Sequence, residues 1–297
     1  MGKIKKIPYK GTELLSAKTD LVFKALMTAD GDLELLASLL SSVLDLNINA
    51  GDITINNTEL TRTGEKDKPA SIDVRVRLAD GKAINIEIQV DTEKCMAARS
   101  VFYLSKLYVE QIAIGMEYDL ICPAIAINIL DFNYLPFAEY HNKYRLKNVR
   151  NNCKLTDVFE VNFLELKKAP KEPGCLKELW MLFLAAESEV ELEMLSKESP
   201  VMEKAVNRLI YFSADEQLRY DLDMREKWVL DHASREAAKL REGIAKGRAE
   251  GKAEGLAQGL EETAVKMLNE NVDIPFIAKI TGLPVDRIAR LKEQHDL

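Results

Sequence analysis

Histidine is scarce in this chain of 297 residues, with only His141, His232 and His295 present. None of the three lies close in sequence to the acidic motif at residues 73–89, which gives little support to histidine-based catalysis. The Gly-x-Ser-x-Gly, P-loop and dinucleotide-binding fingerprints are also missing from the sequence. Serine hydrolases, P-loop nucleotide enzymes and nicotinamide-dependent enzymes are therefore poorly supported.

Cysteine and long apolar runs are equally sparse. The four cysteines are far apart and show neither zinc-ligand spacing nor a disulfide framework: Cys95, Cys122, Cys153 and Cys175. No apolar run approaches the roughly 18 residues of a membrane span, and the first residues lack the apolar region of a signal peptide. The sequence therefore predicts reduced thiols, no membrane partner and a cytoplasmic location.

Overall composition is that of a soluble globular protein, with 47% hydrophobic and 30% charged residues. The formal net charge is −7, which argues against a protein that coats DNA along its whole surface. The negative balance is compatible with a nuclease, because catalytic carboxylates and acidic helices can mask a local basic groove.

Two runs of alternating apolar and polar residues, 71–78 and 82–90, flank the sequence Ala79-Asp80-Gly81. Period-two alternation on both sides of a turn predicts a hairpin of half-buried strands. The apolar sets share a face only if the loop has three residues and Gly81 adopts a left-handed conformation, which pairs Val76 with Ile84.

The same register places Asp73 directly opposite Glu87. Like charges across a sheet repel one another, and the pair costs stability. Two carboxylates roughly 5 Å apart are explained if a cation lies between them. The alternative is an ordinary polar face, neutralised by Arg75, Arg77 and Lys82.

Six short stretches follow one another along the chain: Thr19-Asp20-Leu21-Val22-Phe23-Lys24, Ile72-Asp73-Val74, Asn85-Ile86-Glu87-Ile88-Gln89-Val90, Arg99-Ser100-Val101-Phe102-Tyr103, Ile127-Asn128-Ile129-Leu130-Asp131-Phe132 and Phe163-Leu164-Glu165-Leu166. This ordered set resembles the Rpn family of recombination-promoting nucleases, also labelled transposases, which belongs to the PD-(D/E)xK superfamily in its Glu-x-Gln variant. The resemblance covers about residues 15–170. It implies an α/β fold of the restriction-endonuclease type, with a mixed central sheet flanked by helices and a helical C-terminal extension.

The resemblance implies a metal site at the hairpin. Asp73 and Glu87 are expected to hold Mg²⁺, with Mn²⁺ or another divalent cation as alternatives, together with the backbone carbonyl of Ile88. Gln89 stands where the commoner form of the signature has a catalytic lysine. Because a glutamine carries no charge, Gln89 can only orient water or phosphate by hydrogen bonding.

Three further residues are expected near this site. The resemblance directs Asp20 toward it as a third carboxylate; alternatively, Asp20 only favours the dipole of a helix that begins after Thr19. Arg99 and Tyr103 share one stripe of a helix predicted over 95–116, where they could contact phosphate. For Tyr103 the alternative is half-exposed helix surface. The core stripe of that helix is predicted to be Val101, Leu104, Tyr108 and Ile112.

The most basic window of the chain is residues 140–154, which contain no acid and have interleaved tyrosines. Basic side chains with aromatic neighbours suit a nucleic-acid groove, and a solvated linker is the alternative. The proposed nucleic-acid-binding residues are Lys143, Arg145, Lys147 and Arg150.

Four regions are predicted along the chain. Residues 1–170 are assigned to the nuclease-like core, of which residues 1–18 are expected to form a loose arm. Prolines mark the end of this region. Residues 171–242 form a helical region that packs on or extends the core. Residues 243–262 form a charged helix or linker with glycine at every fourth position, and residues 263–297 resemble a small helix-turn-helix.

The glycine row needs an explanation, since each glycine costs roughly 1 kcal/mol in a helix relative to alanine. A row of glycines allows close approach of a second helix and favours a homo-oligomer; a flexible charged helix is the alternative. The row consists of Gly243, Gly247, Gly251, Gly255 and Gly259. For residues 263–297 two interpretations remain: a helix-turn-helix that binds DNA, or a helical hairpin that serves packing or dimerisation.

Taken together, these features predict a Mg²⁺-dependent DNA endonuclease with little sequence specificity, linked to recombination or mobile-element biology. The competing hypothesis is a catalytically weak or inactive nuclease fold that serves as a DNA-binding or oligomeric interaction protein. True transposition is a second enzymatic alternative, although no strand-transfer chemistry is visible in the sequence.

Overall fold

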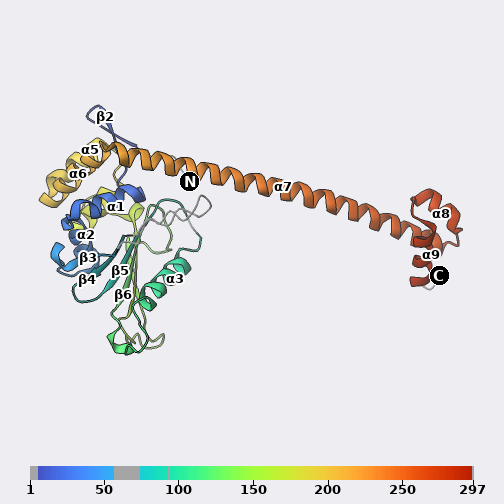
Figure 1. The fold of residues 1–297 in the computed structure, drawn as a ribbon, viewed down its shortest axis with the longest axis horizontal. Helices are drawn as coiled ribbons and strands as arrows, with labels where there is room; N and C mark the ends of the chain where they lie inside the picture. The colour runs from blue at the N-terminus through green and yellow to red at the C-terminus, as the bar shows by residue number, and fades with distance from the viewer. Residues whose placement is uncertain (1–5, 57–73, 93, 296–297) are drawn as a thin grey trace. The chain divides into compact units, whose positions relative to one another are not determined.

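The computed structural model describes residues 6–56, 74–92 and 94–295. The chain divides into two compact units, Met1–Glu226 and Lys227–Leu297. The predicted boundaries at 170, 242 and 262 remain predictions. In the first unit a central sheet is flanked by helices (Figure 1), which confirms the predicted α/β class with a helical C-terminal region.

Within the described residues, the central sheet of the first unit has six strands in the order β3-β4-β5-β6-β8-β7. Strands β5, β6 and β8 run parallel, and the outer strands pair antiparallel. The sheet is therefore mixed, as predicted. Its strands are β3 (Ile53–Ile55), β4 (Val74–Leu78), β5 (Ala83–Gln89), β6 (Ala124–Leu130), β7 (His141–Arg145) and β8 (Phe159–Glu165).

The β4–β5 hairpin has the register expected from the sequence. Val76 pairs with Ile84, and Val74 pairs with Ile86. Gly81 has a φ of 86° and lies against the Cys122 side chain, so a larger residue there would meet both strain and a clash. Residues 71–73, including Asp73, lie outside the described part of the chain.

The crossover between β5 and β6 contains helix α3 (Met96–Val109). The predicted helix over 95–116 is too long, because the chain turns after Val109 and Gly115 is left-handed. The predicted core stripe is wrong at Val101, which is exposed, whereas Leu104 is buried and Tyr108 packs against the same core. The small polar Ser100 faces the sheet instead. The side of α3 that is buried is therefore not the side with the most apolar residues. That buried side consists of Met96, Ser100, Leu104 and Leu107.

The two faces of the sheet are covered differently. Helix α3 packs over one face, on a small core that includes Met96, Leu104 and Phe163. The other face carries the larger core, which contains the isoleucines of β5 and β6. The helices that pack there come from the parts of the chain before β3 and after β8. Those helices are α1 (Asp20–Thr28), α2 (Glu34–Leu44), α4 (Leu176–Ala185), α5 (Glu189–Glu198) and α6 (Pro200–Ser213).

The expected loose arm at 1–18 is wrong for the residues that the structure describes. Strands β1 (Lys6–Tyr9) and β2 (Thr12–Leu15) form a hairpin whose two turn residues, Lys10 and Gly11, both have positive φ. Such a turn matches the twist of paired strands. Ile7 and Leu14 are buried in the main core, so this segment is part of the first unit.

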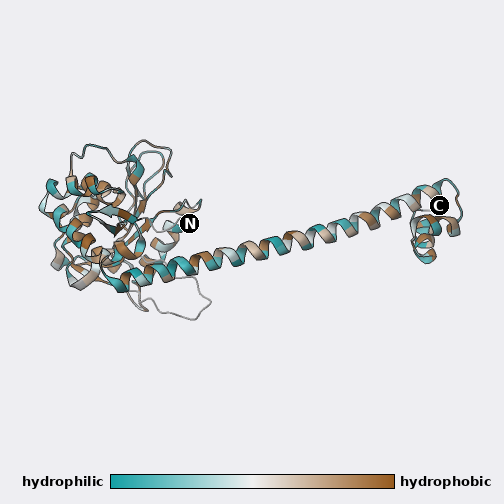
Figure 2. Ribbon diagram, turned by 90° about the horizontal axis from the view of Figure 1, so that it is seen from above, coloured by the Kyte–Doolittle hydropathy of each residue, from teal (hydrophilic) through white to brown (hydrophobic). Residues whose placement is uncertain are grey.

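Helix α7 (Glu216–Asn269) carries the glycine row, and Figure 2 shows hydrophilic and apolar residues alternating along it. A Cβ built on any of the five glycines meets no other described atom within 4 Å. In the second unit, α8 (Ile274–Thr281) and α9 (Val285–Gln294) pack on the end of α7 around Ile277 and Ile288. Among the helices that the structure describes, none has the length and apolar character of a membrane span.

Candidate active site

A row of polar side chains follows the α3-facing side of the central strand β5. Because side chains alternate along a strand, Asn85, Glu87 and Gln89 point to the face opposite Ile86 and Ile88. Glu87 is 4% exposed. Burial of an ionised carboxylate is costly unless a cation or hydrogen-bond donors compensate it. A buried glutamate on the central strand therefore indicates a candidate functional site.

Arg99 of α3 supplies a positive charge at this carboxylate. A terminal guanidinium nitrogen lies 2.8 Å from Glu87 Oε1, and the guanidinium carbon lies 5.4 Å from the centre of the Tyr103 ring. An ion pair at this distance, with one partner buried, interacts more strongly than an exposed surface pair. The structure thus brings together three residues that the sequence assigned to the site.

Two residues that the sequence analysis did not assign to the site hold α3 in place beside it. Ser100 Oγ donates a hydrogen bond of 2.7 Å to Asn128 Oδ1, and both residues are 2% exposed. Asn128 is the β6 residue aligned with Glu87. Adjacent helix residues, Arg99 and Ser100, therefore contact adjacent strands at aligned positions. An asparagine inside an otherwise apolar strand is the signal that could have revealed this pair.

The two amides flanking Glu87 in the row differ in their surroundings. Asn85 is buried, and its Oδ1 has no hydrogen-bond partner among the described residues. Gln89 lies at the end of β5, where its Nε2 is 3.4 Å from the Asp91 carbonyl oxygen. The row therefore presents two amide oxygens beside one carboxylate, all of them hard oxygen donors.

Asp20 lies at the first position of α1, after Thr19, as predicted. Its Oδ1 accepts a hydrogen bond of 2.8 Å from the Leu21 backbone, and its other oxygen forms an ion pair with Arg225 of α7. The Asp20 carboxylate thus links α1 to the start of α7. The role of Asp20 as a third catalytic carboxylate stays a prediction.

The donor set at this site suits a hard divalent cation. Carboxylate, amide and carbonyl oxygens are ligands for Mg²⁺, Mn²⁺ or Ca²⁺, whereas zinc prefers nitrogen and sulfur. Within the described ranges there is no group of three or more His, Cys, Asp or Glu side chains that could hold a metal. Asp73, the second predicted carboxylate, lies outside those ranges, whereas the predicted ligands Glu87 and Ile88 both belong to the described strand β5.

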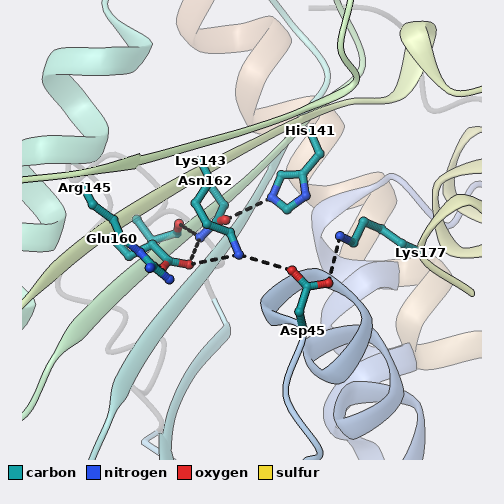
Figure 3. A network of polar contacts seen from close by, with 8 residues as sticks. Asp45, His141, Lys143, Arg145, Glu160, Asn162 and Lys177 are labelled. Carbon is teal, nitrogen blue, oxygen red and sulfur yellow. Dashed lines mark hydrogen bonds and ion pairs between the residues drawn. The ribbon is translucent and has the colours of Figure 1, made fainter. Parts of the chain in front are cut away.

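The predicted nucleic-acid-binding residues are split by the structure. Arg145 Nε donates to Glu160 Oε2 at 2.6 Å, and Lys143 Nζ lies 3.4 Å from Asp45 Oδ2 (Figure 3). Lys143 aligns through Asn162 and Ile127 with Ile86, so both basic side chains lie on the face opposite Glu87. Lys147 and Arg150 follow β7 and are exposed.

His141 belongs to the same network on that opposite face. Its Nε2 is 2.9 Å from Asn162 Oδ1, and Asn162 Nδ2 donates to Glu160 Oε1 at 3.0 Å (Figure 3). Burial holds the pKa of His141 below its ordinary value, and the charges of Lys177 and Lys143 lower that pKa further. The ring is therefore neutral near pH 7 and acts as a packed hydrogen-bonding group.

Comparison with known proteins gives one match. A family model described as PD-(D/E)XK nuclease family transposase matches residues 17–238. No curated protein and no solved structure matches the chain. The matched range contains the β4–β5 hairpin, α3 and the start of α7, and thus every described residue of the candidate site.

Proposed function

Because the chain belongs to the PD-(D/E)XK nuclease family transposases, we propose that it is a divalent-metal-dependent endonuclease that hydrolyses DNA with little sequence specificity. The observation that supports this proposal best is the buried Glu87 on the central strand, with Arg99 at 2.8 Å. Mg²⁺ is the proposed metal, and recombination or mobile-element biology is the proposed context.

Glu87 and Asp73, with the backbone carbonyl of Ile88, are the proposed metal ligands. When bound, the metal supplies Lewis-acid polarisation of the phosphate and a water of lowered pKa. Arg99 stabilises the negative charge that develops on the phosphate oxygens. Gln89 orients water or phosphate by hydrogen bonding. Tyr103 supports the Arg99 side chain through the face of its ring, 5.4 Å from the guanidinium carbon.

DNA is the proposed partner, held mainly through its phosphates, which carry no base information. The exposure of Lys147 and Arg150 supports their assignment as the first contacts. Lys143 and Arg145 complete the predicted set, but each must exchange a carboxylate partner before it can bind a phosphate.

A homo-oligomer through the C-terminal helices is also proposed. The open surroundings of the glycine row in α7 support it, as do three exposed apolar side chains on α8 and α9, namely Phe276, Ile280 and Val285. In the same segment Arg287 is bound to Glu261 at 2.7 and 2.9 Å, which favours a packing role over DNA reading. A cytoplasmic location is proposed because the four cysteines, all of them described, are free thiols.

The second candidate function is a nuclease-like DNA-binding protein with weak or no catalysis. The observation that favours it is Gln89, which stands in place of the usual lysine and can neither donate a proton to the leaving group nor carry charge. Metal dependence separates the two hypotheses, because binding without hydrolysis does not require the cation.

Plasmid cleavage with Mg²⁺ and with EDTA, using wild-type, Asp73→Ala and Glu87→Ala proteins, tests the proposal. Nicking or linearisation that requires both the metal and both carboxylates is expected. Glu160→Gln, a buried glutamate on the other face, is the matched control and should cleave. Unchanged cleavage in either alanine variant would move the active site elsewhere. If the folded wild type leaves plasmid, single-stranded DNA and RNA intact, the binding hypothesis is favoured.

A further inference from the structure

Arg99 and Glu87 are exposed to solvent to different degrees. The Glu87 side chain is 5% exposed, whereas the Arg99 side chain is 26% exposed. The arginine therefore lies nearer to solvent than the carboxylate that it contacts. Any ligand of Glu87 that arrives from solution meets the guanidinium at this carboxylate.

A divalent cation and Arg99 compete for the same oxygen atom. The guanidinium nitrogen lies 2.8 Å from Glu87 Oε1, and Mg²⁺ or Mn²⁺ binds carboxylate oxygens at about 2.0–2.2 Å. Two positive centres so close to one atom repel each other strongly, even at a high effective dielectric constant. Metal binding at Glu87 Oε1 therefore weakens the Arg99–Glu87 ion pair and favours departure of the guanidinium.

In the position that it occupies beside Glu87, Arg99 already has a second stabilising contact on its own helix. The Tyr103 ring, 5.4 Å from the guanidinium carbon, can stabilise the cation through its π face. The backbone of α3 is fixed by the Ser100–Asn128 hydrogen bond and by buried Met96 and Leu104. Rotation of the Arg99 side chain about its own bonds is sufficient for the exchange.

We propose that Arg99 is an exchangeable counter-ion of Glu87. It neutralises the carboxylate until a divalent cation binds there, and it then turns over Tyr103 toward the phosphate of the substrate. This inference rests on the proposed function and adds a role for Arg99 in metal binding. Loss of Arg99 should have effects of opposite sign, since metal binding tightens while cleavage weakens.

Titration of the full chain with Mn²⁺ in the absence of nucleic acid, with free Mn²⁺ measured by electron paramagnetic resonance, tests the exchange. Arg99→Gln is expected to lower the Kd for Mn²⁺ about tenfold, because the Arg99–Glu87 ion pair no longer competes. Lys106→Gln removes a charge from the same stripe of α3 and should change the Kd less than about twofold. At saturating Mn²⁺, Arg99→Gln should cleave DNA at least about tenfold more slowly.

The outcomes separate this inference from the proposed function. If Arg99→Gln binds Mn²⁺ no more tightly than wild type while Glu87→Gln loses binding, the exchange is wrong and the metal site stands. If Glu87→Gln binds Mn²⁺ as well as wild type, the proposed metal site itself fails. A measurement on folded wild type guards against misfolded variants. The ¹⁵Nε resonance of Arg99, identified by its loss in Arg99→Lys, should shift when Mg²⁺ saturates the site, and an unchanged resonance overturns the exchange.

Discussion

Three glutamates of the described sheet are buried, Glu87, Glu160 and Glu165. Glu87 and Glu160 lie on opposite faces, and each is paired with an arginine, whereas Glu165 is paired with Lys168. Glu87 faces α3 and contacts Arg99 at 2.8 Å, whereas Glu160 faces α2 and α4 and accepts from Arg145 at 2.6 Å. Residue type, burial and partner are alike in the two pairs. Their surroundings differ, and that difference distinguishes a structural ion pair from a candidate for chemistry.

Glu160 belongs to a network that contains more than one compensating group. Asn162 donates to its second oxygen at 3.0 Å, and Lys143 lies 3.8 Å from the same atom. Arg99, by contrast, also contacts the face of the Tyr103 ring, which can stabilise the cation when it leaves the carboxylate. A carboxylate held by several fixed partners stabilises the fold, while one whose cation can move is available to a ligand. Matched substitutions on the two faces, compared for cleavage and for stability, can test this distinction.

The largest difference is expected from the two glutamates themselves. Glu87→Gln should reduce cleavage on the order of 10³-fold, because loss of a metal-ligand charge removes several kcal/mol of transition-state stabilisation. The free energy of unfolding should change by less than about 1 kcal/mol, since Gln still accepts from Arg99. Plasmid nicking and urea unfolding measure the two effects. An equal loss of cleavage in Glu160→Gln would contradict the comparison.

The next effect concerns the pair that positions α3. The double variant Ser100→Ala/Asn128→Leu removes both partners of one buried hydrogen bond and also the bond from Asn128 Nδ2 to the Asn162 carbonyl. The free energy of unfolding should therefore fall by about 1–2 kcal/mol. Cleavage should fall on the order of 10²-fold, because displacement of Arg99 by a fraction of an ångström misaligns it. Ser105→Ala, on the same helix with its hydroxyl bonded to the Val101 carbonyl, should leave cleavage unchanged. Wild-type kinetics in the double variant would deny Ser100 and Asn128 a positioning role.

On the other face, Arg145→Met should act on stability alone. Glu160 loses its strongest donor but keeps Asn162 and Lys143. The expected cost is about 1–2 kcal/mol of unfolding free energy, below the value for a fully buried pair because Arg145 is half exposed. Cleavage per folded molecule should match wild type. Adding Glu160→Gln to Arg145→Met should recover part of the lost stability, as urea midpoints can show.

The smallest effect is a pH dependence from the same network. The pKa of His141 in the folded chain is held below its ordinary value of 6.5 by burial and by Lys177 and Lys143. The unfolded chain therefore binds the proton more readily, and stability should fall as pH drops through 6.5 and the folded-state pKa below it. Asp45 also acts on this ring, but partial burial of Asp45 is outweighed by Lys177 and Lys143, which hold its pKa below the ordinary value of 3.8. His141→Gln should flatten the stability profile between about pH 7.5 and 5.5 in urea titrations; an unchanged slope would assign it to other groups.

Sequence patterns predicted the centre of the fold well because two constraints agreed there. Alternation on both sides of the turn and the need for a left-handed Gly81 allow a single register, and the structure has it. The placement of Arg99 beside Glu87 also agrees with the expectation from the sequence. Asp73 lies outside the described residues, so its half of the predicted site stays a prediction.

Features that depend on distant partners were not predictable in the same way. Strand β7 has polar residues on both faces, and only its pairing with β8 identifies it as a strand. Ser100 counts as polar in any periodicity analysis, yet Asn128 makes its burial favourable. The ion pair between Asp20 and Arg225 joins residues 205 positions apart in the chain, and no local pattern reports such a contact.

The position of β7 has a consequence for solubility. Among the described strands β7 is the last in the sheet order and has one edge without a paired strand, and such an edge can pair with the edge of another molecule. Lys143 and Arg145 place positive charges along this edge, and charged side chains discourage such pairing. The same two residues that the sequence suggests for DNA binding therefore also protect the protein from edge-to-edge aggregation, and their replacement by apolar residues would expose this strand to self-association whether or not DNA is present.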